Sequence, residues 1–131
     1  MQVVTFDNKP AVIQYNADGT YYYNTEIKEV EFSTENGETD GKTKTEKKWQ
    51  AEQYTIQNPI TKANVKRTVI LEHWDKDEQE KLINEYNSVA LGVITEQEDI
   101  EKVTKAYTDF LKQRDELVKK TEEDLKNTNL Q

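Results

Sequence analysis

The sequence of 131 residues contains no cysteine, only two prolines and four glycines, and a single histidine. Without cysteine the chain can form no disulfide framework, no thiolate nucleophile and no metal centre held by thiolates. His73 and the two serines, Ser33 and Ser88, do not stand in the pattern of a Ser-His-Asp triad or a nucleophile elbow. No run of apolar residues exceeds four, which is too short for a membrane-spanning helix.

The glycines are scattered along the chain, so no glycine-rich loop is available to hold a phosphate group. The segment 72–77 combines His73 with three carboxylates, which is the only mixture of this kind that suggests a metal. A calcium-binding loop beginning at Asp75 would need glycine where Glu80 stands. We therefore interpret His73 as a helix-end residue, and we expect no metal, no cofactor and no catalytic residue.

Charge of either sign is abundant but evenly distributed. Asp and Glu number 26 against 18 Lys and Arg, which gives a net charge of -8, divided equally between residues 1–58 and 59–131. Neither part carries a basic patch for phosphates, so we expect no direct contact with nucleic acid. Met1–Asp7 lacks the basic start and apolar stretch of a secretion signal, and the sequence therefore indicates a soluble protein of the cytoplasm.

The N-terminal part is typical of β-strands. Short runs rich in β-branched and aromatic residues alternate with turn residues such as Asn8, Pro10 and the Asp18-Gly19 pair. The predicted strands are Val3–Phe6, Ala11–Tyr15, Tyr21–Tyr23, Ile27–Phe32 and Trp49–Ile56. The first two are expected to pair as a hairpin, and the third to complete a meander. Trp49, Tyr54 and Ile56 are expected to be buried and to anchor the sheet against the helices.

Residues 33–48 contain no hydrophobic side chain, and the next one in the sequence is Trp49. Asn36-Gly37 and Asp40-Gly41 lie within this segment, which predicts a long polar loop. It serves either as a solvated connection or as a partner-binding finger.

The remainder of the chain is typical of helices. Apolar residues recur at helical spacing from Lys62 to Trp74, with Thr61 as the expected cap. A second helix is expected to begin at Asp75 or Asp77 and to end at Gly92. The tetrapeptide 95–98, Thr-Glu-Gln-Glu, matches a capping box, so Thr95 is expected to cap a third, long helix.

Together these patterns predict an α+β fold, in which an antiparallel β meander of four to five strands precedes three helices, the last one long. We expect a single domain over residues 1–131, with the β meander in 1–57, its polar loop at 33–48 and the helical part in 58–131. Val, Ile, Leu and Phe number only 28 residues, so the 12 aromatic residues must supply much of the core.

The stretch Trp74–Asn87 and the acidic helix that follows Gly92, with Tyr107, Phe110, Leu111 and Arg114, resemble a known group of proteins. These are small accessory proteins encoded beside the tail and tail-fibre genes of tailed phages and prophages. The helix opening Asn58-Pro59-Ile60-Thr61 is similar too, so the resemblance covers residues 58–125 and leaves the tyrosine-rich meander outside it. It implies a non-enzymatic assembly, chaperone-like or minor structural role, and it transfers no catalytic residue.

A helix from Glu96 to about Lys126 would be longer than the domain that carries it. We therefore expect its last turns to be covered by the first helix, by a second copy of the chain in a weak contact, or by a protein partner. The interaction residues predicted there are Arg114, Leu117, Val118 and Leu125. The leading interpretation is a protein–protein interaction or assembly module, associated with the virion if the phage resemblance holds. The alternatives are an acidic decoy that mimics nucleic acid, and a small ligand-binding or enzymatic domain.

Overall fold

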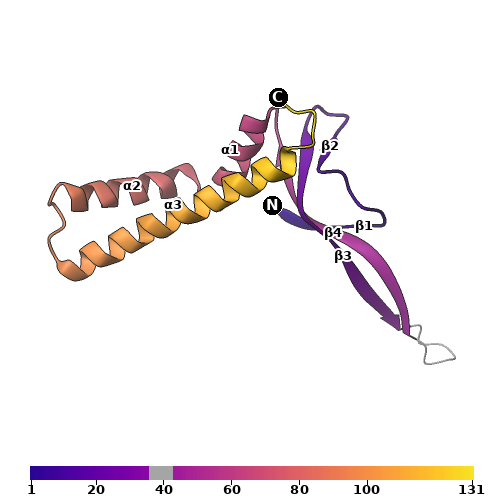
Figure 1. Ribbon diagram of the computed structural model, residues 1–131, viewed down its shortest axis with the longest axis horizontal. Coiled ribbons are helices and arrows are strands. Elements are labelled where there is room, and N and C mark those ends of the chain that lie inside the picture. Colours follow the sequence, from indigo (N-terminus) through magenta and orange to yellow (C-terminus); the bar gives the residue numbers. More distant parts are fainter. Residues whose placement is uncertain (36–42) are drawn as a thin grey trace. The chain divides into compact units, whose positions relative to one another are not determined.

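The computed structural model describes the backbone of residues 1–35 and 43–131. Within those ranges it contains an antiparallel four-stranded sheet followed by three helices, the last one long, which confirms the predicted α+β class (Figure 1). The strands are β1 (Gln2–Phe6), β2 (Ile13–Tyr15), β3 (Tyr21–Glu35) and β4 (Thr43–Ile56). The helices are α1 (Lys62–His73), α2 (Lys76–Ala90) and α3 (Gln97–Leu125).

The strand order is β1-β4-β3-β2, so the predicted hairpin between the first two strands is wrong. The strand β1 pairs with β4, with Gln2 opposite Gln53 and Phe6 opposite Trp49, whereas β2 pairs with β3. The turn residues between β1 and β2 carry the chain across to the opposite edge of the sheet. Turn residues predict only that the chain reverses direction. Which strand an edge strand pairs with depends on contacts between residues distant in sequence.

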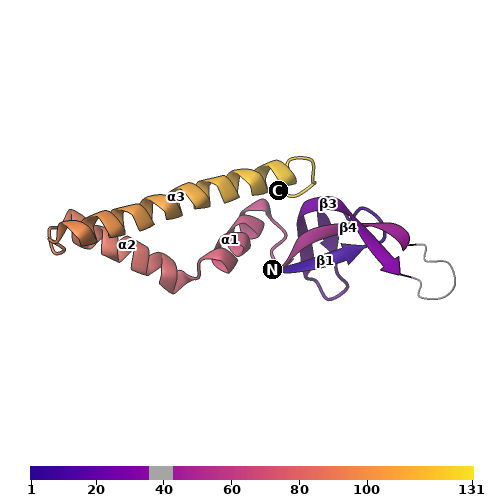
Figure 2. The ribbon, with the colours of Figure 1, turned by 90° about the horizontal axis from the view of Figure 1, so that it is seen from below.

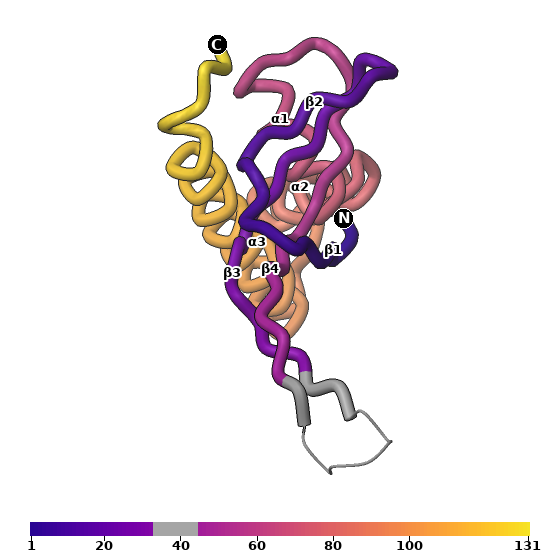
Figure 3. Tube along the Cα trace, turned by 90° about the vertical axis from the view of Figure 1, so that its right-hand side faces the viewer, coloured from indigo at the N-terminus to yellow at the C-terminus, as the bar shows by residue number. Residues whose placement is uncertain are grey.

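The third strand is longer than predicted. Tyr21–Tyr23 and Ile27–Phe32 belong to one continuous strand, β3, which is interrupted only by a register shift between Thr25 and Lys28. Glu26 has a φ of 50° at this point, where the bulge absorbs one extra residue. The polar loop expected at 33–48 is strand in its described part, because β3 continues to Glu35 and β4 begins at Thr43. Figure 3 shows β3 and β4 running side by side toward this segment. Residues 36–42 of that predicted loop lie outside the described residues.

Aromatic side chains of β3 and β4 form much of the buried core of the sheet. Tyr21 lies opposite Ile56 and Tyr23 opposite Tyr54, and all four side chains are buried. The rings of Tyr23 and Tyr54 stack with centroids 5.8 Å apart. The expected burial of Tyr54 and Ile56 is thus confirmed. Trp49, the third predicted anchor, is only half-buried and lies beneath the Lys9 ammonium group, 5.6 Å from the ring centroid.

Four side-chain amides, one from each strand, form a hydrogen-bonded row across the sheet that we name the amide ladder (Gln2, Gln53, Asn24 and Gln14). Gln2 Nε2 donates to Gln53 Oε1 over 3.3 Å, and Gln53 Nε2 donates to Asn24 Oδ1 over 3.1 Å. Asn24 Nδ2 in turn donates to Gln14 Oε1 over 2.6 Å and to the Ala11 carbonyl over 2.8 Å. Because Asn24 and Gln53 are buried, this row satisfies polar groups that water cannot reach.

The helix starts follow the sequence in two cases of three. The hydroxyl of Thr61 accepts from Asn64 N at the start of α1, and the carboxylate of Asp75 accepts from Glu78 N over 2.7 Å at the start of α2. The capping box predicted for α3 is wrong, since the N-cap residue is Glu96 and its side chain makes no capping hydrogen bond.

The chain divides into two compact units. One comprises Met1–Asn64 together with Asn127–Gln131, and the other comprises Val65–Lys126. In the first unit Lys62 N donates to the Gln131 carbonyl over 2.8 Å, which ties the last residues beside the start of α1. In the second unit α2 and α3 run side by side in opposite directions (Figure 2).

Candidate functional site

The helical hairpin of α2 and α3 has an incompletely covered apolar surface. No residue of α2, which the structure describes in full, is buried. Leu82 and Val89 are half-buried, and Ile83 is 41% exposed. An amphipathic helix normally buries its apolar stripe within its own domain, so this hairpin retains apolar area for another surface.

Aromatic contacts hold the hairpin together. Tyr86 of α2 stacks on Tyr107 of α3 with ring centroids 4.5 Å apart and planes inclined by 16°. Trp74, which precedes α2, meets Phe110 edge-on at 5.1 Å. Such pairs contribute about 0.5–1.5 kcal/mol beyond their buried area. The hairpin is thus fixed at two levels along α3.

The turn at the end of α2 is fixed by a Schellman motif. Val93 N donates to the Ser88 carbonyl over 2.8 Å, and Gly92 N donates to the Val89 carbonyl over 3.1 Å. Gly92 supplies the required positive φ of 74°. The hydrophobic contact that often accompanies this motif is missing here because the partner position, C3, is the polar Ser88. The turn instead directs apolar side chains outward.

Leu91 and Val93 are the two most exposed large hydrophobic residues in the part of the chain that the structure describes, at 80% and 74%. We name these two residues the tip. Three exposed carboxylates follow within a few residues, at Glu96, Glu98 and Asp99, and we name them the acidic collar. Glu98 and Asp99 stand in the first turn of α3, where the helix dipole favours negative charge. The tip therefore combines a rigid apolar knob with negative charge beside it.

A hollow of about 340 Å³ lies where α1 ends against α3. It is lined by His73, Trp74, Gln113, Glu116, Leu117 and Lys120. The ring of His73 is tilted against Trp74 at 5.6 Å, and its Nδ1 lies 2.9 Å from the Val69 carbonyl oxygen. His73 therefore ends α1 as predicted and also borders the hollow.

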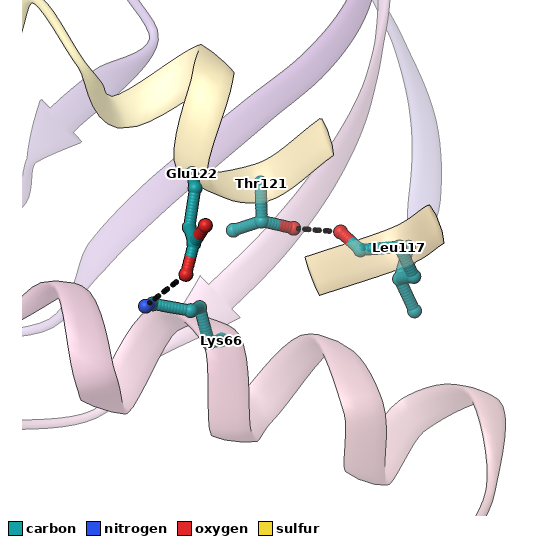
Figure 4. A network of polar contacts seen from close by, with 4 residues as sticks. All are labelled: Lys66, Leu117, Thr121 and Glu122. Carbon is teal, nitrogen blue, oxygen red and sulfur yellow. Dashed lines mark hydrogen bonds and ion pairs between the residues drawn. The ribbon is translucent and has the colours of Figure 1, made fainter. Parts of the chain in front are cut away.

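Polar contacts fix α3 beside α1 in this unit (Figure 4). Lys66 Nζ lies 2.8 Å from Glu122 Oε1, which joins the two helices. Thr121, which interrupts the apolar spacing of α3, is buried and donates its hydroxyl to the Leu117 carbonyl over 2.8 Å. This internal hydrogen bond allows a polar residue to occupy a buried position.

The predicted interaction residues have different environments. Arg114 is exposed, Val118 is half-buried, and Leu117 is half-buried in the wall of the hollow. Leu125 is 0% exposed, so its side chain is not available to a partner. Leu125 is therefore a core residue and not a contact residue. Helix length alone does not show which residues of α3 the rest of the chain covers.

The tip and the hollow were missed at the sequence level. The signal for the tip is present, because Leu91-Gly92-Val93-Ile94 places large apolar residues at a turn where polar ones are usual. The hollow has no local signal, since its walls come from segments about 40 residues apart in the sequence.

Among the side chains that the structure describes, those of residues 1–32 and 45–131, no three His, Asp or Glu gather closely enough to hold a metal ion. None of the described helices is both long enough and apolar enough to cross a membrane. Comparison with protein-family models, with curated proteins and with solved structures gave no match.

Proposed function

We propose that this chain is a non-enzymatic protein–protein interaction or assembly module that binds its partner through the tip of the α2–α3 hairpin. The observation that supports this proposal is the exposure of Leu91 and Val93 on a turn whose backbone is already fixed. A rigid apolar knob loses little conformational entropy on binding, and burying its surface contributes about 25 cal/mol per Å².

The charge distribution argues against the decoy alternative. Carboxylates of α2 and α3 pair with lysines one turn away, as in Lys81–Glu85, Lys105–Asp109 and Lys119–Asp115. A mimic of nucleic acid needs uncompensated negative charge at regular spacing, whereas these helices carry alternating signs.

The phage accessory role, with a cytoplasmic or virion-associated location, is part of the same proposal and rests on the resemblance of residues 58–125. The genes on either side of this one test it. Neighbouring tail or tail-fibre genes would support it, and neighbours of unrelated function would count against it.

The interaction itself is tested by photo-crosslinking in the cells that produce the protein. A photoreactive amino acid at Val93 is compared with the same amino acid at Thr104, an exposed residue of α3 away from the tip. We expect adducts of discrete mass at position 93 that are not formed at position 104. Equal adducts at both positions, or none at either, would contradict binding through the tip.

A further inference from the structure

The second unit carries two features of opposite shape. The tip is convex and apolar, with the acidic collar beside it. The hollow is concave and has apolar walls at Trp74 and Leu117. Its volume of about 340 Å³ is near the lower limit of about 300–1,000 Å³ for ligand pockets, which suits one or two aliphatic side chains better than a large ligand.

The charges of the two features are compatible. The rim of the hollow carries an ammonium group at Lys120, the imidazole of His73 and one carboxylate at Glu116. The collar supplies three carboxylates beside the tip. A tip seated in the hollow would bring the collar near Lys120, and Glu116 is the one carboxylate among the residues that line the hollow.

The tip of a chain does not reach the hollow of the same chain. Trp74 immediately precedes the Asp75 cap of α2, and Leu91 immediately follows its last residue. A helix of 15 residues spans about 22 Å, and it holds the two features apart. Any contact between them must therefore join two copies.

We infer that the tip of one copy, Leu91 and Val93, inserts into the hollow of a second copy between Trp74 and Leu117. This inference rests on the proposed function and names a second copy of this chain as the partner. Because the tip and the hollow are different surfaces, the contact is heterologous, and repetition leads to head-to-tail chains or closed rings.

Complementary variants test this contact. The tip variant L91E/V93E keeps an intact hollow, and the hollow variant L117E keeps an intact tip. Leu111→Glu is the matched control, because Leu111 is an exposed leucine of α3 outside both features. Light scattering across a concentration series measures the mass of each variant and of the equimolar mixture of the tip and hollow variants.

We expect the parent and the Leu111→Glu variant to associate increasingly with concentration. The tip and hollow variants should each stay monomeric, with a dissociation constant raised at least tenfold, whereas their mixture should form a dimer and nothing larger. A monomeric parent, a mixture that stays monomeric, or a loss of association in Leu111→Glu would overturn the inference.

If the circular dichroism of L117E shows that this variant is unfolded, two charge variants test the contact instead. Lys120→Glu should weaken association of the parent, and Glu116→Lys should strengthen it, since the collar is negative. Equal effects of the two variants would contradict the proposed docking. A parent that stays monomeric while Val93 still crosslinks to another protein would refute self-association and leave the proposed function standing.

Discussion

Asn24 connects three of the four strands through its side chain alone. Its amide nitrogen donates to the Ala11 carbonyl and to Gln14, and its oxygen accepts from Gln53. Replacing it with leucine leaves several groups without partners, each at a cost of about 1–3 kcal/mol. We expect Asn24→Leu to lower the free energy of unfolding by about 3 kcal/mol, measured by urea denaturation.

Two further variants identify the cause of that loss. Asn84→Leu alters an exposed amide on α2 and should change stability little. Adding Gln53→Leu to Asn24→Leu removes the stranded amide as well, so part of the lost stability should return. A double variant that is no more stable than Asn24→Leu alone would show that the ladder does not act as a unit.

Tyr21 makes the free energy of unfolding depend on pH in the alkaline range. Burial raises the pKa of its hydroxyl above the usual value of about 10, and the hydroxyl donates to the Pro59 carbonyl over 3.0 Å. As pH rises above about 10, only the unfolded chain loses this proton, so stability falls until the raised folded-state pKa is passed. Tyr21→Phe should cost about 1 kcal/mol at neutral pH and flatten this alkaline decline. Parallel pH profiles for parent and variant would refute the assignment.

At the scale of single elements, the start of α2 offers a direct comparison. The sequence allowed either Asp75 or Asp77 as its cap, and the structure assigns the cap to Asp75. Asp75→Ala should lower stability by about 1 kcal/mol, as measured from thermal melting. Asp77→Ala removes only a favourable charge in the first turn and should cost less. A larger loss at Asp77 would contradict the observed cap.

The helices were predictable because their signals are local. Caps and apolar spacing lie within one element, so the bounds of α1 and α2 were close to those observed. The long β3 was not predictable from alternation, because beyond Phe32 its sequence contains no hydrophobic residue and the backbone ladder alone defines the strand. The pairing of β1 with β4 likewise depends on contacts 51 residues apart.

The candidate site was predictable only in part. Helical spacing directed attention to Leu117 and Val118 on α3, and Leu117 does line the hollow. The helical spacing of apolar residues does not show which other parts of the chain cover them. For this reason Leu125 was predicted to be an interaction residue although its side chain is buried. The amide ladder was missed for the related reason that a polar residue in a strand is ordinarily assigned to the solvent face.

At the scale of the whole molecule, the net charge of -8 opposes compaction. The ion pairs of α2 and α3 are exposed and stabilise the helices little, so repulsion between carboxylates should dominate the response to salt. We expect sodium chloride to raise the melting temperature by several degrees between low and moderate ionic strength. Potassium chloride should act equally, because the effect is general screening. A melting temperature that falls with salt would show that ion pairs dominate.

The strand order also delays the pairing of β1 during protein synthesis. The ribosome adds about 5–20 residues per second, so Gln2 is made about 3–10 s before its partner Gln53. Through that interval β1 has no strand to join, since β2 pairs with β3 and the edge that receives β1 belongs to β4. Val3 and Val4 thus remain without their sheet partners on the nascent chain, and a chaperone that binds short apolar segments has several seconds in which to engage them.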